Sequence, residues 1–587
     1  MIIKSLYPDI EIPTVDLFTF LMKRTDRSFP ESQGMYDTKW KRPYESSLIH
    51  IVIFQDALTN KTLRFADVHT QAEKFGRGLA HRFSISKGDV VLVCSLSHIE
   101  MPVVILGALW AGAIITTANP DYTIGELRHQ IQDSGASVVI TNDHAFDKVG
   151  KACASCNISS DRLMLLGGDL EGSRQSRHWS STCTSDLQSP PCLSIASEKD
   201  VAFLVYSSGT TGKPKGVRLS HYNVISNILQ YQAAESGSMS WDGSKTSGGI
   251  PFPSGGDRIL ACLPFSHIYG LTILALSPIY SGVTTFVLPR FNLKMWCQLI
   301  QKHKITFSYV VPPIVLHLAK DPSVTDYDFS SLRMTHSGAA PLTRELVEIV
   351  YNRLGIRVKQ GYGLSETSPC LYQGTWEDWN VDIGSCGALL PNIEAKICVP
   401  VDESNVHSTT LAPRSLPQGE IGELHVRGPN VFLGYHNNQA ATLGCRSEDG
   451  WFRTGDVGYI NSRGNLFITD RVKELIKYKG FQVAPAELEG HLLEFSGVSD
   501  CAVLGVWDNK LATEVPRAYI VSQNVDIHDL MEWYKSRVVS YKLLRGGIKV
   551  IESIPRNASG KILRRKLKER AQAEFAKEQR NVDKARL

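Results

Sequence analysis

The stretch YSSGTTGKPKG, from Tyr206 to Gly216, has the composition of a loop that holds phosphate groups. It follows the apolar run Val201 to Val205, which predicts a buried strand. Glycines let backbone N–H groups approach an anion closely, hydroxyls add donors, and lysines add positive charge. The common NTPase loop needs another spacing, because Gly209 and Gly212 are too close here and Lys213 is followed by proline. The stretch therefore predicts a polyphosphate site of a different kind, with a flexible linker as the alternative.

A second group of polar side chains ends the predicted strand Val358 to Gly363. The segment QGYGLSE, from Gln360 to Glu366, places an amide, an aromatic ring, two glycines, a hydroxyl and a carboxylate at one strand tip. Open α/β sheets bind their ligands at the carboxyl ends of the strands. This segment is therefore a candidate nucleotide site, and a tight turn with a solvated glutamate is the alternative.

Three later stretches carry charges that suit a nucleotide. WFRTGD ends at Asp456, and an aspartate can accept hydrogen bonds from both hydroxyls of a ribose. DRVK begins at Asp470 and adds a guanidinium at Arg471. PRNASGK ends at Lys561, a compact charge for a phosphate, and Gly560 before it gives the backbone a flexible tip. Each of these stretches alone is also compatible with a polar surface turn.

In this order, the five stretches resemble the motifs of the adenylate-forming superfamily: acyl-CoA synthetases, 4-coumarate–CoA ligases, luciferases and peptide-synthetase adenylation domains. A free carboxylate is a poor electrophile, because its charge repels nucleophiles and its oxygen is a poor leaving group. Enzymes of this superfamily join the carboxylate to AMP, which requires ATP bound in line and charge opposite the departing pyrophosphate. The resemblance extends from about residue 50 to about residue 565.

The resemblance implies a nucleotide role for most polar residues in these stretches. Adenine would lie against Gln360 to Gly363, Ser365 would contact a phosphate, and Glu366 would bind Mg²⁺. The superfamily usually has threonine at the position of Ser365, which keeps the hydroxyl. The implied ATP-binding residues are Ser207, Ser208, Gly209, Thr210, Thr211, Lys215, Gln360, Gly361, Tyr362, Ser365, Asp456 and Arg471.

Residues after Asp470 are implied to serve a moving domain. By the same matching, Lys473 is the hinge about which the C-terminal domain turns, and Lys561 is the catalytic lysine that reaches the α-phosphate. The residues matched to the acyl-adenylate are Lys477 and Gln482, and those matched to the CoA channel are Lys479 and Gly480. Read without the family, the lysines between 473 and 479 form a solvated face.

His267, in the stretch LPFSHIYG, is the candidate on the side of the acid substrate. A lone histidine beside apolar residues is more often structural, but the coumarate-ligase branch uses this position to gate or contact the acyl group. The residues matched to the acyl pocket are Tyr269, Ile273, Ala339, Cys370 and Leu371. They supply no cation for a second carboxylate, so the implied acid is monocarboxylic with an apolar or aromatic body. Coumarate ligases often have serine at the position of Ile273, so the predicted pocket differs from theirs at this point.

Composition excludes several classes of protein. A net charge of +4 over 587 residues, without a dense basic patch before the C-terminal tail, argues against nucleic acid as a partner. The most apolar window, Pro102 to Ile115, is shorter than the about 20 residues that a membrane span needs, so we expect no transmembrane segment. The N-terminus does not read as a secretory signal. Twelve scattered cysteines, with one C-x-x-C at Cys153 and Cys156, favour free thiols in a reducing compartment.

The order of the predicted elements favours an α/β fold. Helical segments alternate with short apolar runs up to Gly363, which predicts layered α/β subdomains with mainly parallel strands, and residues 387–431 predict a β-rich subdomain. We expect a large N-terminal domain over 1–470 that binds ATP and acid, a small mobile α+β domain over 471–570, and a charged tail over 571–587. Two polar insertions are expected at 167–191 and 235–256.

The terminal tripeptide Ala585-Arg586-Leu587 is similar to the S-K-L peroxisomal address. It predicts a peroxisomal protein with an import receptor as partner, and a cytoplasmic one otherwise.

Together these observations predict an acid–CoA ligase that uses ATP, CoA and Mg²⁺ on a small carboxylic acid. A stand-alone adenylation enzyme that loads a carrier protein is one alternative, although the sequence has no G-G-[HD]-S carrier site and no aspartate near His267 for an amino group. A luciferase-like oxygenase would use the same adenylate. A binding scaffold without activity is the remaining alternative, and Glu366, Asp456 and Lys561 argue against it.

Overall fold

The structure is a computed structural model. It describes residues 1–27, 29, 51–168, 177–185, 194–207, 214–235, 238–243, 256–400, 413–479, 481–522, 524–557 and 560–586. Most of both expected polar insertions lies outside these residues, as do Ser208 to Thr211, Gly480 and Leu587, and so do the side chains of 579–586.

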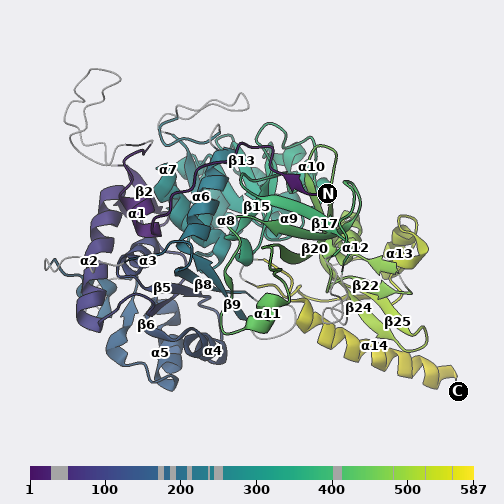
Figure 1. Cartoon of the computed structure of the whole chain (residues 1–587). Helices are drawn as coiled ribbons and strands as arrows, with labels where there is room; N and C mark the ends of the chain where they lie inside the picture. Colours follow the sequence, from purple (N-terminus) through teal and green to yellow (C-terminus); the bar gives the residue numbers. More distant parts are fainter. Residues whose placement is uncertain are drawn as a thin grey trace.

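Among the described strands, seven form a mainly parallel sheet near the N-terminal end of the chain. Their order is β19 (Gly434–Tyr435), β9 (Lys215–Ser220), β8 (Val201–Ser207), β5 (Ile114–Ala118), β4 (Val90–Cys94), β6 (Ala136–Thr141) and β7 (Leu163–Leu165). The accompanying helices are α1 (Leu17–Met22), α2 (Phe65–Phe83), α3 (Met101–Trp110), α4 (Ile124–Ser134), α5 (Phe146–Ser155) and α6 (His221–Glu235) (Figure 1). Local signals bound these helices: α4 begins at a capping box of Thr123 and Glu126 and ends at Gly135, whose φ is 69°.

A second sheet, with nine strands within the described residues, carries the centre of the chain. Its order is β16 (Ala388–Leu389), β15 (Cys370–Gln373), β14 (Val358–Gly363), β13 (Met334–Ser337), β12 (Phe307–Val310), β10 (Arg258–Ala261), β11 (Thr284–Val287), β2 (Val52–Asp56) and β3 (Thr62–Arg64). Its helices are a π-helix at Gly270–Leu276, α7 (Ser277–Ser281), α8 (Leu293–His303), α9 (Pro312–Lys320) and α10 (Arg344–Leu354). The six strands from β14 to β2 in this order are parallel neighbours, so their carboxyl ends share one edge.

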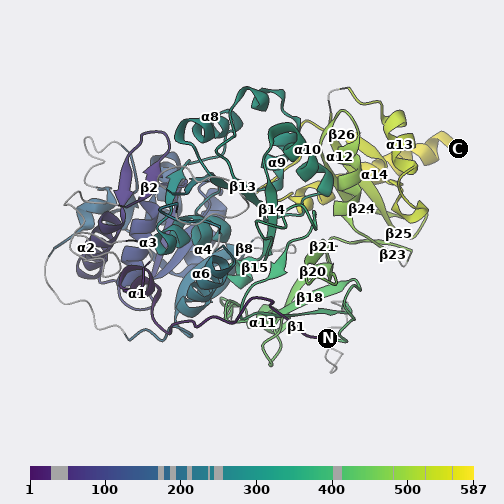
Figure 2. The same ribbon diagram turned by 90° about the horizontal axis from the view of Figure 1, so that it is seen from above.

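The β-rich part is an antiparallel sheet that also takes in the N-terminal strand (Figure 2). Its described strands are β1 (Ile3–Lys4), β17 (Glu394–Cys398), β18 (Gly422–Arg427), β20 (Phe452–Ile460) and β21 (Leu466–Arg471), and α11 (Gln439–Leu443) lies in a connection. The short 3-10 turns lie at Asp143–Ala145, Ser160–Arg162, Trp179–Thr182, Pro322–Asp326, Ser365–Thr367 and Ser540–Lys542.

The remaining elements build a small unit at one end of the molecule (Figures 1 and 2). They are β22 (Ile476–Tyr478), β23 (Phe481–Val483), α12 (Pro485–Glu494), β24 (Val498–Asp508), β25 (Thr513–Ser522), α13 (Ile527–Lys535), β26 (Ile548–Val550) and α14 (Arg564–Arg586). Its buried side chains form a hydrophobic cluster of their own, separate from the clusters of the large unit. The expected α/β fold with a large N-terminal and a smaller C-terminal domain is confirmed.

Two ends of the chain differ from the expectation. The N-terminal part, for which no helix was predicted, contains α1, whose N-cap Asp16 accepts the N–H of Thr19. Residues 571–587 were expected to be a charged tail, yet α14 runs to Arg586, and Ala571 and Phe575 are buried in the small unit's core. The mostly charged sequence of α14 hides the few apolar positions that face that core.

Two further expectations concern membranes and cysteines. None of the described helices is both long and apolar enough to cross a membrane. The described cysteines are free, including Cys153 and Cys156.

Candidate active site

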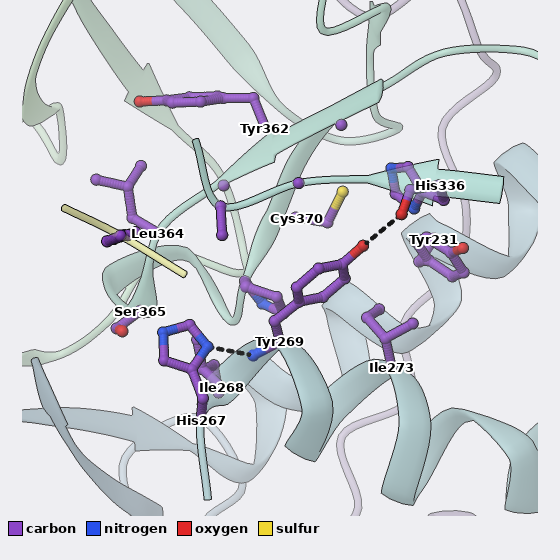
Figure 3. A pocket seen from close by; sticks show the side chains of 16 residues that line it. Tyr231, His267, Ile268, Tyr269, Ile273, His336, Tyr362, Leu364, Ser365 and Cys370 are labelled. Carbon is purple, nitrogen blue, oxygen red and sulfur yellow. Dashed lines mark hydrogen bonds between the residues drawn. The ribbon is translucent and has the colours of Figure 1, made fainter. Parts of the chain in front are cut away.

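A small cavity lies where the carboxyl ends of β13 and β14 meet the start of the π-helix (Figure 3). Its volume is about 50 Å³. Its wall consists of Tyr231, His267, Ile268, Tyr269, Ile273, His336, Gly338, Ala339, Gly361, Tyr362, Gly363, Leu364, Ser365, Pro369, Cys370 and Lys561. Of these, Lys561 alone comes from the small unit. The cavity is thus formed by the strand ends of the large unit and by one lysine of the small unit.

A cleft of about 750 Å³ adjoins this cavity and separates the large unit from the small one. The two hollows share Ala339, Gly361, Tyr362, Gly363 and Lys561 in their walls. The cleft also contains the expected nucleotide residues Gln360, Asp456, Arg471 and Lys473. Lys561 therefore stands where a molecule in the small cavity would meet a nucleotide in the cleft.

The phosphate-loop candidates are described only at their two ends. Ser207 ends β8, and its hydroxyl donates to Glu366 Oε1 over 3.4 Å. The Tyr435 hydroxyl donates to the same oxygen over 2.9 Å, and Lys215 Nζ lies 5.0 Å from the centre of the Tyr435 ring. The structure thus gathers Ser207, Lys215 and Glu366, while Ser208, Gly209, Thr210 and Thr211 lie outside the described residues.

Glycines at the tip of β14 are required by close neighbours. A Cβ on Gly361 would lie 2.3 Å from His336 Nε2, and one on Gly363 would lie 2.0 Å from the carbonyl oxygen of Pro369. Real Cβ atoms do not approach other atoms so closely. The motif is therefore glycine-rich because the strand tip is packed tightly against the cavity wall.

Asp456 is held in place by two side chains of the cleft. Its Oδ2 accepts a hydrogen bond of 2.6 Å from the Tyr362 hydroxyl, and its Oδ1 lies 2.9 Å from Arg471 Nε. The pKa of Tyr362 is well above its usual value, because the ring is buried and its hydroxyl faces this carboxylate. Tyr362, Asp456 and Arg471, which were each expected to bind part of the nucleotide, are thus linked by direct contacts.

Burial and the charge of Arg471 lower the pKa of Lys561 to about 8. Asp456 and Glu366 oppose this shift. Lysine readily loses its proton when it is buried, which makes the charge of this lysine depend on what occupies the cleft. A phosphate placed beside it would favour the charged form.

His267 is neutral and has a defined orientation. Its Nδ1 accepts the backbone N–H of Tyr269 over 3.3 Å, so the ring proton resides on Nε2 (Figure 3). Burial, together with the charge of Lys561, lowers its pKa to about 3. His267 can therefore donate a hydrogen bond into the cavity, but does not act there as a cation.

The expected acyl-pocket residues are mostly brought together. Tyr269, Ile273, Ala339 and Cys370 line the small cavity. Leu371 does not: it is fully buried away from both hollows, because successive side chains of a strand such as β15 point to opposite faces.

Among the wall residues that sequence reasoning missed are Tyr231 and His336. Tyr231 comes from α6, where apolar spacing marks only a buried helix, and His336 precedes the Ser-Gly-Ala-Ala turn after β13. A histidine at the end of a predicted parallel strand is the one signal that could have found His336.

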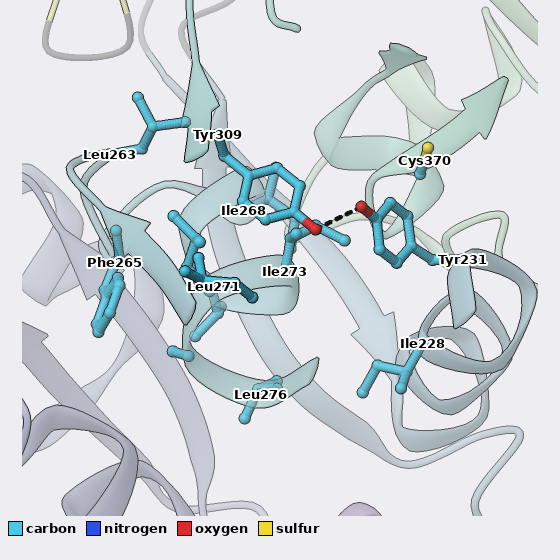
Figure 4. Close-up of a cluster of buried hydrophobic side chains, with 14 of the residues drawn as sticks. Ile228, Tyr231, Leu263, Phe265, Ile268, Leu271, Ile273, Leu276, Tyr309 and Cys370 are labelled. Carbon is cyan, nitrogen blue, oxygen red and sulfur yellow. Dashed lines mark hydrogen bonds between the residues drawn. The ribbon is translucent and has the colours of Figure 1, made fainter. Parts of the chain in front are cut away.

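A buried polar network begins at Tyr231 in the cavity wall. Tyr231 and Tyr309 share a hydrogen bond of 2.5 Å among buried hydrophobic side chains (Figure 4), and Tyr231 also donates to Glu235 over 3.1 Å. Glu235 in turn pairs with Lys359, and both side chains are about 1% exposed. Trp376 Nε1 donates to the other oxygen of Glu235 over 2.5 Å. Lys359 is therefore paired with a carboxylate of the protein and is not free to bind a second carboxylate of the acid.

The chain matches a family model described as "AMP-binding enzyme" over residues 49–436, and one described as "AMP-binding enzyme C-terminal domain" over residues 487–561. The first match covers more than half of the chain. The protein belongs to the AMP-binding enzyme family. A probable 4-coumarate–CoA ligase 1 of Dictyostelium discoideum is 35% identical, with 96% of this chain and 97% of that one covered. The 4-coumarate–CoA ligase of Pinus taeda is 36% identical, with 88% of this chain and 91% of that one covered.

Solved structures show the same fold. The o-succinylbenzoate CoA synthetase of Bacillus subtilis in complex with AMP is 26% identical, with a TM-score of 0.70, and covers 88% of this chain and 95% of that one. The anthranilate CoA ligase AuaEII in complex with anthranoyl-AMP is 21% identical, with a TM-score of 0.79, and covers 96% of this chain and 99% of that one.

In this AMP-binding enzyme the described residues that were expected to contact the acyl-adenylate from the small domain, or to line the CoA channel, lie apart from both hollows. Lys477, Lys479 and Gln482 are exposed on the β22–β23 hairpin, and none of them lines the cavity or the cleft. The backbone N–H of Lys479 donates to Thr513 in the same small unit. Their predicted roles stay predictions, and Gly480 lies outside the described residues.

The expected hinge of this AMP-binding enzyme follows the last strand of the β-rich sheet. Asp470, in β21, accepts the N–H of Ala486 at the start of α12 over 3.0 Å, and Lys473 lies between these two elements. Burial raises the pKa of Asp470 to about 7.

Within the part of the chain that the structure describes, no three His, Cys, Asp or Glu side chains gather where they could hold a metal ion. Glu366 lies just after the tip of β14, where its Oε1 accepts from Ser207 and Tyr435. Mg²⁺ commonly takes one or two protein carboxylates and completes its shell with phosphates and water. A single glutamate is therefore compatible with a metal that arrives with the nucleotide.

Proposed function

We propose that this protein is an ATP-dependent acid–CoA ligase that activates an apolar or aromatic monocarboxylic acid as acyl-AMP and transfers the acyl group to CoA. The observation that carries the proposal is the position of Lys561. It reaches from the small domain to the junction of an apolar cavity and a cleft that contains Asp456 and Arg471. Formation of acyl-AMP from the acid and ATP requires a positive charge at that junction.

The first step joins the acid to AMP. The carboxylate oxygen attacks the α-phosphorus of ATP, and the bond from that phosphorus to the oxygen of pyrophosphate breaks. Lys561 neutralises the charge that develops between these groups, and His267 donates from Nε2 to hold the carboxylate. Asp456 accepts from the ribose hydroxyls. The buried wall of the cavity keeps water from the acyl-AMP.

Glu366 is proposed to hold Mg²⁺ together with the phosphates of ATP. The ion would offset the negative charge of the phosphates and pyrophosphate. Ser207 and Tyr435 donate to Glu366 Oε1 and orient its carboxylate.

The second step requires the small domain to turn. We propose that it rotates about Lys473, withdraws Lys561 and brings the β22–β23 hairpin to the cavity. Lys477 and Gln482 would then contact the acyl-adenylate, and Lys479 with Gly480 would line the path of CoA. The thiol sulfur of CoA attacks the acyl carbon, the bond to the AMP oxygen breaks, and the thiol proton is released. Exchange of two packings about one hinge is a rigid-body domain switch.

The substrate class follows from the cavity. Its wall is apolar or aromatic apart from His267, His336, Ser365 and the catalytic Lys561, and Lys359 is paired with Glu235. Several relatives are named 4-coumarate–CoA ligases. Ile273 narrows the cavity from the π-helix, which favours an acid whose body is apolar at that point.

A peroxisomal location is proposed from Ala585-Arg586-Leu587 alone. A fluorescent fusion at the N-terminus should enter peroxisomes, and removal of the last three residues should leave it in the cytoplasm. The same pattern with both fusions would disprove the proposed address and its import receptor.

The test of function is a pyrophosphate-release screen with ATP, Mg²⁺ and a panel of cinnamates, benzoates, phenylacetate, fatty acids and amino acids, with and without CoA. A ligase releases pyrophosphate with one class of acid and forms a thioester only when CoA is present. Adenylate without thioester would instead indicate a carrier-protein acceptor or an oxygenase. No adenylate from any acid, with ATP still bound, would contradict the proposal.

A further inference from the structure

Helix α9 contacts the small domain at both of its ends. Its N-terminal end lies against the loop that carries Lys561: a Cβ on Gly560 would lie 3.1 Å from Val311 Cγ2 and 3.3 Å from Pro313 Cγ. Pro312 and Pro313 also line the cleft. The orientation that places Lys561 in the cavity therefore seats its loop on the first turn of α9.

The C-terminal end of α9 is bonded to the small domain through Lys320. Lys320 Nζ donates to the carbonyl oxygen of Leu493 over 3.0 Å and to that of Val498. Leu493 lies in the last turn of α12, and Val498 begins β24. The last carbonyls of a helix have no partner within it and attract cations, so a lysine is well suited to bind there.

The same contact region leads back to the Lys561 loop. Asp500, one of the groups whose charge acts on Lys320, pairs with Arg556 over 2.8 Å. Arg556 also donates to the carbonyl oxygen of Gly560 over 2.9 Å. Leu493 packs against the cores of both domains. Lys320 is thus bound to the part of the small domain that supports the loop of the catalytic lysine.

We propose that Lys320 is a positioning residue that holds the small domain in the orientation required for acyl-AMP formation. Its two bonds cross the domain boundary, so rotation about Lys473 must break them before CoA can react. The inference rests on the proposed ligase function. Loss of these bonds should reduce the population of the adenylate-forming orientation and leave the cavity and the cleft unchanged.

The test compares the two half-reactions in Lys320→Met. Acid-dependent exchange of pyrophosphate into ATP should fall about tenfold in kcat, the effect of losing hydrogen bonds from a charged group, with KM for the acid unchanged. Thioester formation from supplied acyl-AMP and CoA should be unchanged or faster. An equal fall in both half-reactions, or no change in either, would overturn the proposal.

Lys304→Met is the matched control, because Lys304 makes only an exposed ion pair with Asp328 in the same domain. It should leave both half-reactions unchanged, and Lys320→Arg should restore most of the exchange activity. Hydrogen exchange gives a readout that does not depend on any substrate. Lys320→Met, and not Lys304→Met, should increase exchange in peptides that cover residues 485–500 and the Lys561 loop. Unchanged exchange there would overturn the proposal even if no acid substrate were found.

Discussion

The small domain carries two lysine-bearing segments, which differ in their exposure to solvent. The loop that ends at Lys561 is inserted between the domains and lines both hollows. The β22–β23 hairpin, with Lys477, Lys479 and Gln482, is exposed and lines neither. Each segment contains one glycine and two basic residues, so composition alone does not separate them.

In the proposed mechanism this difference means that only one of the two segments faces the cavity in a given orientation of the small domain. Burial lowers the pKa of Lys561, because its amine leaves water, whereas the hairpin lysines stay in solvent. A reaction in two steps can therefore be controlled by which segment faces the cavity.

The largest effect is expected for Lys561→Met. Loss of this cation should reduce acid-dependent pyrophosphate exchange about 10²- to 10³-fold, the usual cost of removing one group that stabilises a transition state. Thioester formation from supplied acyl-AMP should be retained, since the lysine leaves the cavity in that step. Equal losses in the two assays would show that the loop and the hairpin do not act separately.

A smaller effect in both half-reactions is expected for Asp456→Asn, because Asp456 belongs to the large domain and does not leave the cleft. Loss of its charge weakens the hold on the ribose hydroxyls and on Arg471, so kcat/KM for ATP should fall about 10- to 100-fold. The KM for acyl-AMP in the thioester assay should rise as well. A defect confined to one assay would contradict a fixed nucleotide site.

Substitutions in the exposed hairpin should affect the second step alone. Lys477→Ala and Gln482→Ala should each slow thioester formation about tenfold, as expected for the loss of one hydrogen bond to a charged group. Pyrophosphate exchange should be unchanged. Lys542→Ala, which removes an ion pair with Glu487 on the same domain, is the control and should alter neither assay. Slower exchange in the hairpin variants would place the hairpin in the first step.

The smallest expected effect is a several-fold fall of adenylation at high pH. The pKa of Lys561 is lowered from its usual value to about 8, so the free enzyme loses this charge as pH rises through 8. The kcat/KM for pyrophosphate exchange should therefore decline above pH 8, and the thioester step should lack this decline. Lys561→Arg keeps its charge at high pH and should shift the decline upward, whatever its absolute rate. A decline at the same pH in that variant would assign it to another group.

Local sequence patterns predicted much of the fold. The apolar runs before the phosphate loop and before QGYGLSE form β8 and β14, and the window from Pro102 to Ile115 forms α3 and the start of β5. α1 and the full length of α14 were missed. Both pack their apolar side against segments far away in the sequence, which periodicity in a short or highly charged segment does not reveal.

The site shows the same division. The order of the residues alone indicated which chemical groups are present and which turns carry them, because both are properties of short stretches of the chain. The folded structure was needed to show that Tyr231 and His336 line the cavity and that Leu371 does not. It was also needed to show that Lys561 lies between the domains, while Lys477 and Gln482 remain exposed. Those positions depend on how helices, strand faces and two whole domains bury their apolar surfaces against one another, and no stretch of the chain encodes that alone.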